Sequence, residues 1–343
     1  MPLVGNICSV GGIVGIDLTH GGALDAMRAA YPNATEPWID LSTGINPWPY
    51  ENVSVSDAAL THLPTRSAYL TCRNAMASAI GANPAALLLA PGSELLIRLL
   101  PNIIKPQTVA ILEPTYGDHA EVWIRTGAKV IRAQDPLSLA TSVDAVVIAH
   151  PNNPDGRTFS ADALEKARQM LAVRGGWLII DEAYADLTPD ESFASYGGED
   201  GVIVLRSFGK FFGLAGLRLG GLIAPEEVRK GFSNHVGVWP VSGAALEIGA
   251  RAYEDLEWQV KTRAKLKGAS ERLDNLLTSQ GFKVVGGTDL YRLIEAPDAH
   301  SLFERLAKAG IYVRRFAWSQ KHLRIGLPPN REAEERLRLA LSL

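Results

Sequence analysis

Short apolar runs recur through the middle of this 343-residue chain, and each one ends at a polar or glycine-containing turn. A run of four or five apolar residues suits a strand that is buried on both faces, as in a parallel sheet covered by helices. Helical patterns, such as residues 161–173, stand between several runs, so the alternation favours an α/β domain. The predicted strands are residues 86–90, 108–112, 129–131, 145–149, 177–180, 202–205 and 219–223.

The pattern changes after about residue 225. A helical stretch rich in Glu, Lys, Arg and Leu covers about residues 244–279, and strand patterns then surround a predicted helix at 301–309. These later strands are expected at residues 282–285, 290–295 and 311–313. Such a mixture is typical of a smaller α+β domain.

We therefore expect three parts. Residues 1–45 form an N-terminal arm that belongs to the small domain and the substrate side. Residues 46–225 form a large α/β domain with helices on both faces of its sheet, and residues 226–343 form the C-terminal α+β domain, which includes the long connecting helix. In an open parallel sheet, ligands bind beyond the carboxyl ends of the strands, so the site is expected there.

Composition limits the classes of partner. The formal net charge of -3 provides no basic face for nucleic acid or an anionic membrane. No apolar run reaches the roughly 18–20 residues that span a bilayer. The two cysteines indicate a reducing compartment, and the seven histidines lack metal-ligand spacing. We expect a cytoplasmic protein with a small-molecule substrate and no metal.

Lys210 stands in unusually apolar surroundings, among the Phe, Leu, Ala and Gly residues of segment 207–218. Burial disfavours an ammonium, and a neutral amine can form a Schiff base with a carbonyl cofactor. Pyridoxal phosphate combines an aldehyde, a phosphate and a pyridine nitrogen. Ser207 and Arg218 flank the lysine as possible phosphate ligands. A lysine that only begins a helix beside a buried glycine-rich turn is the alternative interpretation.

Further polar residues follow other predicted strands. Asp181 comes directly after residues 177–180 and could pair with a protonated pyridine nitrogen, or could cap the next helix. Tyr184, three residues on, and Asn153, after the strand at 145–149, could both hydrogen-bond the phenolic oxygen of the cofactor. These groups would meet at one edge of a parallel sheet.

Two more segments suit the same cofactor. Gly92, Ser93 and Glu94 begin a helix directly after the strand at 86–90, and the exposed N–H groups of a helix start attract a phosphate. Tyr116 follows the next strand and could stack on the cofactor ring, or could only cover the core.

The order of these elements resembles the aminotransferase superfamily of fold type I pyridoxal-phosphate enzymes. The resemblance covers nearly the whole chain and is strongest at residues 151–156, 181–184 and 207–218. It implies that Lys210 bonds the cofactor and that Asp181 pairs with the pyridine nitrogen. It also implies that Arg324 binds the substrate carboxylate, a role that its planar fork suits. The remaining cofactor residues would be Gly92, Ser93, Glu94, Tyr116, Asn153, Tyr184, Ser207 and Arg218.

Within that superfamily, residues 20–22, 41–47 and 239–242 are similar to the threonine-phosphate decarboxylases, which are related to the histidinol-phosphate aminotransferases. This likeness implies decarboxylation of O-phospho-L-threonine to (R)-1-amino-2-propanol O-2-phosphate in cobalamin biosynthesis. The residues implied on the substrate side are His20 and Arg314 for the phosphate, together with Gly44, Asn46, Asn153 and Arg324. His20, beside two glycines, could instead only shape a turn.

One position departs from the family pattern. Relatives commonly carry a tyrosine before the proline at 64, and that tyrosine reaches the cofactor phosphate of a neighbouring subunit. This chain has Leu63 instead, and Tyr69 or Arg66 could substitute for the tyrosine. The expected homodimer therefore depends on family architecture. Two other functions stay open: an aminotransferase acting on histidinol phosphate or a similar compound, and a non-enzymatic relative that keeps the fold for binding.

Overall fold

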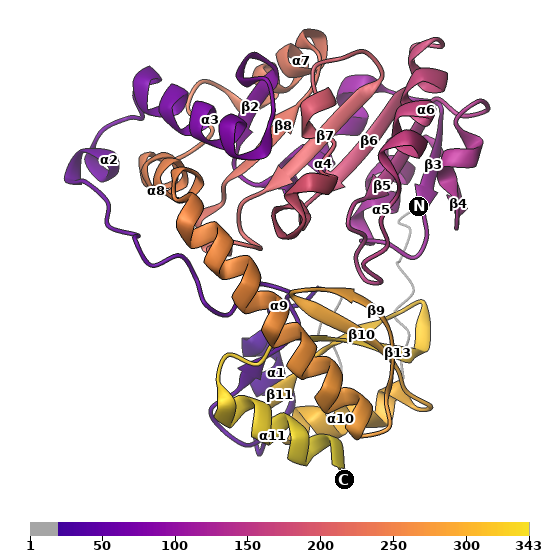
Figure 1. Ribbon diagram of the computed structural model, residues 1–343. Coiled ribbons are helices and arrows are strands. Elements are labelled where there is room, and N and C mark those ends of the chain that lie inside the picture. The colour runs from indigo at the N-terminus through magenta and orange to yellow at the C-terminus, as the bar shows by residue number, and fades with distance from the viewer. Residues whose placement is uncertain (1–19, 343) are drawn as a thin grey trace, which may run out of the picture.

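A seven-stranded sheet forms the centre of the larger body of the molecule (Figure 1). The computed structural model describes residues 20–342, so the expected arm at residues 1–19 lies outside the described residues. The strands of this sheet are β2 (Leu87–Ala90), β3 (Thr108–Leu112), β4 (Lys129–Ala133), β5 (Ala145–Ala149), β6 (Trp177–Glu182), β7 (Val202–Ser207) and β8 (Gly220–Ile223). Their order is β2-β8-β7-β6-β5-β3-β4, and only β8 runs against its neighbours.

The apolar runs form these strands because the sheet is covered on both faces. Every residue of β5 is buried, and its Val-Val-Ile centre is made of β-branched side chains that pack well on a pleated surface. All seven predicted strands are confirmed, with bounds that differ from the expected ones by at most two residues.

Helices cover the sheet in two layers, which confirms the predicted three-layer α/β/α architecture. One core lies between the sheet and α3, α6 and α8, and the other lies between the sheet and α4, α5 and α7. These helices are α3 (Arg66–Ile80), α6 (Ala161–Ala172), α8 (Gly243–Glu254), α4 (Ser93–Ile104), α5 (Asp118–Arg125) and α7 (Glu226–Val236). Because α7 and α8 pack on this sheet, the larger body extends beyond the boundary expected at residue 225.

The smaller body contains a four-stranded antiparallel sheet, with the order β12-β13-β10-β9 (Arg314–Phe316, Ser319–Gly326, Tyr291–Glu295 and Lys283–Thr288). Strand β1 (Ile39–Asp40) pairs in parallel with β11 (Ile311–Tyr312), which joins the N-terminal segment to the C-terminal part of the chain. The helices of this body are α1 (Leu24–Ala30), α10 (Ala299–Lys308) and α11 (Arg331–Ser342).

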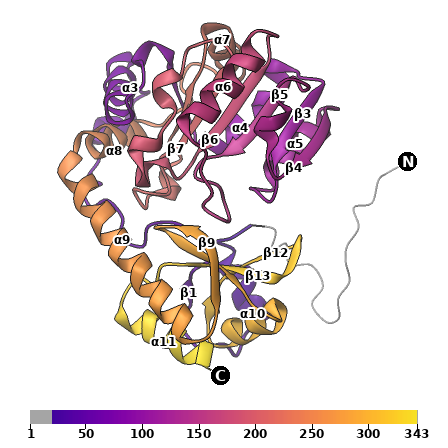
Figure 2. The same ribbon diagram turned by 45° about the vertical axis from the view of Figure 1, so that its right-hand side comes forward.

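Helix α9 (Leu256–Ser279) runs from the larger body to the smaller one (Figures 1 and 2). The prediction of one continuous helix over residues 244–279 was wrong, since the helix is interrupted at Asp255, between α8 (Gly243–Glu254) and α9. The Asp255 carboxylate accepts a hydrogen bond from the backbone N–H of Trp258 at 3.0 Å, and this cap starts a new helix in a new direction.

Residues 41–65 cross from the smaller body to the larger one as an extended segment that contains one short helix, α2 (Asp57–Thr61). Between residues 20 and 342, no helix is both long and apolar enough to cross a membrane. The carboxyl ends of β3, β5, β6 and β7 lie at one edge of the large sheet, so the polar residues that follow them are collected there.

Candidate active site

Lys210 lies in the turn after β7, where the larger body meets the segment at residues 41–50. Its side chain is half-buried, and its ammonium donates a hydrogen bond to the backbone carbonyl of Thr43 at 3.4 Å. The Nζ atom is 6.0 Å from the centre of the Tyr184 ring. Phe208 and Phe211 on either side of the lysine are fully buried and hold the turn in place. The lysine does not begin a helix.

Asp181 is held by two groups at the end of β6. One carboxylate oxygen, Oδ2, lies 3.0 Å from Nε2 of His119, and the other accepts from the backbone N–H of Ala183 at 3.1 Å. The Asp181 side chain is buried, as is the His119 ring. Asp181 therefore stabilises the local turn and presents an oriented carboxylate, but it does not cap the short helix Ala185–Leu187, which begins after Tyr184 without a side-chain cap. Its pairing with a pyridine nitrogen stays a prediction.

The sequence does not predict a role for His119, because the histidines lack metal-ligand spacing and the strand pattern does not mark this residue. The ring lies on α5 and meets the Tyr116 ring edge-to-face, with centroids 5.9 Å apart. Its one signal in the sequence is its place three residues after Tyr116, at the carboxyl edge of the sheet. A lone histidine of this kind could be assigned only after its partner Asp181 is known.

A cradle for an anion lies where β2 and β7 end and β8 begins. Gly92 has a left-handed φ of +87°, and a Cβ atom added there would lie 2.5 Å from a terminal nitrogen of Arg218. Ser207 pairs with Gly220 across the β7–β8 ladder, and a Cβ at Gly220 would lie 2.8 Å from the backbone nitrogen of Ser93. The start of α4, a hydroxyl and a guanidinium thus surround one small space, which suits a phosphate.

Glu94 contacts the Tyr116 side of this cradle. Its Oε2 accepts from the Tyr116 hydroxyl at 3.0 Å, and its other oxygen pairs with Arg98. Burial raises the pKa of Tyr116, and the nearby carboxylates of Glu94 and Asp118 add to the effect, so this hydroxyl stays protonated. The structure therefore gives Glu94 a hold on Tyr116, and a direct cofactor contact for Glu94 stays a prediction.

Tyr184 closes the other side of the lysine. It is almost fully buried and meets the Tyr291 ring edge-to-face at 5.2 Å. Gly44 adopts φ +60°, and a Cβ there would lie 3.0 Å from the Tyr184 hydroxyl and 2.9 Å from the Tyr291 ring. Gly44 is needed because the backbone passes so close to these two rings.

Two arginines of the smaller body stand opposite each other. Arg314 on β12 and Arg324 on β13 are direct register partners, so their side chains share one face of the sheet. Arg324 is buried, lies over the Tyr291 ring at 4.8 Å and donates to Oδ1 of Asn153 at 2.6 Å. Burial and the charge of Arg324 lower the pKa of Arg314 to about 10. Two cations on one face attract anions.

His20 and Asn46 occupy different places. His20 is exposed, with Nε2 3.5 Å from Oδ1 of Asp118 and its ring 6.0 Å from that of Tyr116, and its expected contact with substrate stays a prediction. Asn46 is buried, and its amide donates to the carbonyl of Phe211 at 2.8 Å. The structure shows Asn46 supporting the lysine turn, and its expected contact with substrate stays a prediction.

Within the part of the chain that the structure describes, no three His, Cys, Asp or Glu side chains are grouped so that they could hold a metal ion. The acceptors at the site instead alternate with cations, phenols and amides. Such a set can bind an organic ligand that carries a phosphate, a ring and an aldehyde.

Comparison with known proteins gives a consistent result. The family model for class I and II aminotransferases matches residues 37–343. The threonine-phosphate decarboxylase of Sinorhizobium sp is 39% identical over 330 residues, which are 95% of this chain and 98% of that protein. The chain belongs to the class I and II aminotransferase family. The threonine-phosphate decarboxylase of Pseudomonas aeruginosa is 36% identical over 94% of this chain and 97% of its own length.

Solved structures show the same aminotransferase fold. A histidinol-phosphate aminotransferase from Clostridium acetobutylicum superposes with a TM-score of 0.77 at 19% identity, covering 88% of this chain and 97% of that one. The enzyme of that name from Sinorhizobium meliloti, determined in complex with pyridoxal-5'-phosphate, gives a TM-score of 0.76 at 18% identity and covers 93% of each chain. These distant likenesses confirm the predicted fold type I architecture of the family.

Proposed function

We propose that this chain is a pyridoxal-phosphate-dependent decarboxylase that converts O-phospho-L-threonine to (R)-1-amino-2-propanol O-2-phosphate for cobalamin biosynthesis. The two relatives named threonine-phosphate decarboxylase match it over nearly their whole length and support this choice. The observation that carries the proposal is the facing pair of Arg314 and Arg324. Arg324 lies near Lys210, because the two side chains donate to the neighbouring carbonyls of Ser42 and Thr43. A substrate with a carboxylate and a phosphate supplies two anions that such a pair can bind.

The described residues fit the cofactor. Bound through its aldehyde to an amine, pyridoxal phosphate supplies an electron sink for a bond to Cα. The cradle of Gly92, Ser93, Ser207 and Arg218 would hold the phosphate, because a glycine with no Cβ leaves the helix start open to an anion. Asp181, oriented by His119, would pair with the pyridine nitrogen.

The remaining cofactor contacts follow from the same geometry. Tyr184 and Asn153 would bind the phenolic oxygen, and Tyr116 would lie against the ring. Lys210 would bond the aldehyde. Its amine lies near Tyr184 and Thr43, so it is also the group that would return a proton to Cα after carbon dioxide leaves.

Arg314 and Arg324 of the smaller body would orient the substrate. Arg324 uses one donor on Asn153 and one on the carbonyl of Ser42, so its fork keeps further N–H groups for a carboxylate. Arg314, and His20 from the other side, would bind the substrate phosphate. Holding both ends of the substrate fixes the rotation about Cα, and this rotation decides which bond breaks.

The decisive experiment mixes the cofactor-loaded protein with O-phospho-L-threonine, without a keto acid, and analyses the product by mass spectrometry. We expect loss of carbon dioxide with the amine retained over many turnovers. Lys210→Ala should fall below detectable turnover, because it removes the amine that bonds the cofactor and returns the proton. Continued turnover by this variant would contradict the proposed role of Lys210.

The alternative is an aminotransferase that acts on histidinol phosphate or a similar compound. A histidinol-phosphate aminotransferase of Archaeoglobus fulgidus is 26% identical over 80% of this chain, so this reaction belongs to a more distant relative. In the same experiment, this alternative predicts unchanged substrate, or a single stoichiometric conversion to the keto acid. A protein that binds the cofactor without any turnover would support the non-enzymatic interpretation.

The proposal includes a homodimer in the cytoplasm. Exposed apolar side chains gather near the position where relatives carry the intersubunit tyrosine, at Leu60, Leu63, Val238 and Trp239. Val238 and Trp239 also line a cavity of about 310 Å³ next to the larger body. A patch of this kind marks an interface, and a second copy is the occupant that family architecture supports. A reducing compartment is consistent with the buried, unpaired thiol of Cys72.

A further inference from the structure

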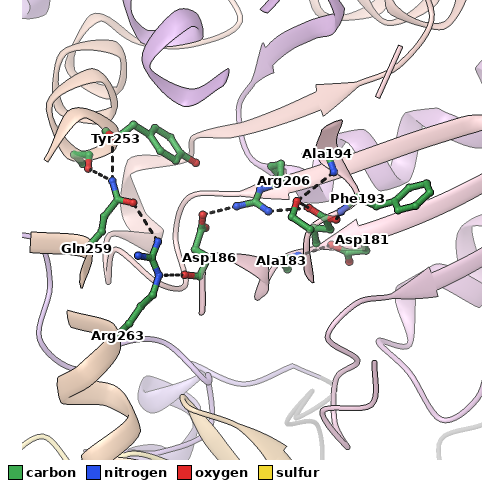
Figure 3. Close-up of polar contacts among 12 residues, drawn as sticks. Asp181, Ala183, Asp186, Phe193, Ala194, Arg206, Tyr253, Gln259 and Arg263 are labelled. Carbon is green, nitrogen blue, oxygen red and sulfur yellow. Dashed lines mark hydrogen bonds and ion pairs between the residues drawn. The ribbon is translucent and has the colours of Figure 1, made fainter. Parts of the chain in front are cut away.

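A buried ion cluster lies on the back of the two strands that carry the site (Figure 3). Glu182 on β6 and Arg206 on β7 are register partners, and side chains alternate along a strand, so both point away from the face of Asp181 and Ser207. The Arg206 guanidinium donates to Oε2 of Glu182 at 2.8 Å and also to Asp186. All three charged groups of this cluster are buried.

Arg263 connects helix α9 to this cluster. Its Nε donates to the backbone carbonyl of Asp186 at 2.7 Å, and a terminal nitrogen donates to Oε1 of Gln259 at 3.3 Å (Figure 3). Its guanidinium carbon also lies 5.3 Å from the centre of the Phe211 ring. Burial lowers the pKa of Arg263, and the acids Asp186 and Asp190 oppose this shift.

Through these contacts, Arg263 on α9 touches two segments: the one that follows Tyr184 and the turn that bears Lys210. Asp186 follows Tyr184 by two residues, and Phe211 directly follows Lys210. The Phe211 carbonyl is in turn held by Asn46, so the lysine turn is fixed from two sides. Helix α9 continues into the smaller body, which carries Arg314 and Arg324. The placement of the two bodies is therefore linked to the placement of Lys210 and Tyr184.

We propose that Arg263 is a positioning residue that fixes the segments bearing Lys210 and Tyr184 relative to α9, and so to the two substrate arginines. The part of the inference that concerns turnover rests on the proposed function, whereas the part that concerns the lysine environment rests on the contacts alone. A planar guanidinium is required because it must donate in its plane to Asp186 while its face covers Phe211.

The test compares Arg263→Met with Arg272→Met in the full-length, cofactor-loaded protein. Arg272 lies on the same helix but is exposed, and its Nε makes a long ion pair of 3.8 Å with Glu334. Its variant therefore removes a charge from α9 without changing a contact of the turn that bears Lys210. For Arg263→Met we expect kcat to fall about tenfold, which corresponds to roughly 1.4 kcal/mol. The KM should change less than about twofold, because the substrate arginines are untouched.

A spectroscopic measurement separates positioning from stability. The absorbance of the cofactor bonded to Lys210 should titrate with a midpoint shifted by about half a pH unit or more in Arg263→Met, since its surroundings change. Arg272→Met should titrate as wild type. Arg263→Lys keeps the charge but not the planar fork, so it should show most of the shift. It also replaces Arg263→Met if that variant fails to fold.

Hydrogen exchange provides a readout that needs neither cofactor nor turnover. Backbone amides at residues 184–187 and 208–213 should exchange about tenfold faster in Arg263→Met than in Arg272→Met. Unchanged exchange, or a wild-type midpoint together with wild-type kcat, would overturn the inference. If the wild-type protein does not decarboxylate O-phospho-L-threonine, the proposed function fails while the exchange and the titration still decide the role of Arg263.

Discussion

Two buried arginines of this molecule have opposite surroundings. Arg206 is 1% exposed and Arg324 is 5% exposed. Arg206 contacts two carboxylates, those of Glu182 and Asp186. Arg324 donates to two neutral oxygens, Oδ1 of Asn153 and the carbonyl of Ser42, and no carboxylate from residues 20–342 pairs with it. Its Nε is buried without a hydrogen-bond partner among those residues.

The difference distinguishes a charge that is paired within the fold, that of Arg206, from a charge that we propose binds substrate, that of Arg324. Removing a charge from water costs several kcal/mol unless a counter-charge is buried with it. The protein itself supplies that counter-charge to Arg206. In the proposed function a substrate carboxylate supplies the counter-charge of Arg324, so we expect the buried charge of Arg324 to lower the stability of the free protein. Burial alone therefore does not show what an arginine does, whereas its partners do.

The largest expected effect comes from breaking the structural cluster. Arg206→Met would leave Glu182 and Asp186 buried without their counter-charge, and we expect the free energy of unfolding to fall by about 3–5 kcal/mol. Urea titration followed by circular dichroism measures this loss in the protein without cofactor. A change of less than about 1 kcal/mol would show that the cluster does not stabilise the sheet.

A compensated variant provides the control for Arg206. Combining Arg206→Met with Glu182→Gln and Asp186→Asn removes all three charges, and most of the lost stability should return, because no unpaired charge stays buried. A triple variant as unstable as Arg206→Met alone would instead attribute the loss to packing around Tyr253 and Phe193, which border the cluster.

Arg324→Met should show the reverse pattern, with activity lost and stability kept. A hydrogen-bonded contact with a charged group contributes about 1.5–3 kcal/mol, so kcat/KM for O-phospho-L-threonine should fall by about 10- to 150-fold. The free energy of unfolding should stay the same or rise, since a buried charge that lacks a carboxylate partner is removed. Steady-state kinetics and the urea titration measure the two quantities on one preparation.

Arg324→Lys is the matched control for geometry. It keeps the charge but loses the fork that can bind a carboxylate through two donors, so it should recover little of the lost kcat/KM. A lysine variant with wild-type kinetics would mean that Arg324 acts only as a positive charge, and the proposed carboxylate contact would then be wrong.

The sequence predicts how the candidate site residues of the larger body are grouped, because most of them lie at the end of a strand or a few residues after it. Strand ends in a parallel sheet meet at one edge, so the strand pattern alone is enough to group Asp181, Asn153 and Lys210. The same reasoning cannot reach Arg206 or Arg263. Pairing Arg206 with Glu182 requires the strand register, and Arg263 is one of many charged residues in a helical stretch.

The break between α8 and α9 shows why the sequence does not predict the contacts of Arg263. Helical periodicity continues through residues 244–279, and the carboxylate of Asp255 was not recognised as a cap within it. The direction of α9 decides which of its faces meets Phe211. Because the sequence pattern does not indicate the break, it cannot predict that Arg263 contacts Phe211. The partner of His119 likewise depends on how α5 packs against β6.

The smallest expected effect is that of Arg314→Met, which tests whether Arg314 contributes to substrate binding or to stability. The KM for O-phospho-L-threonine should rise about tenfold, equivalent to roughly 1.4 kcal/mol, because one cation for the substrate phosphate is lost. Like charges that face each other across a strand pair cost about 0.2–1 kcal/mol, so unfolding should require slightly more free energy than in wild type. The sign agrees with the pKa of Arg314, which burial and Arg324 lower to about 10. A lowered pKa means that the charged guanidinium is less stable in the folded protein than in the unfolded chain, although Arg314 stays charged at neutral pH.

Arg315→Met is the matched control, because it removes a charge at the next position of β12, where the guanidinium lies over the Phe303 ring. This variant should leave the KM unchanged, since neighbouring side chains on a strand point to opposite faces of the sheet. If Arg314→Met instead lowered stability and left the KM at its wild-type value, Arg314 would belong with Arg206 as a structural charge. The substrate phosphate would then need another ligand.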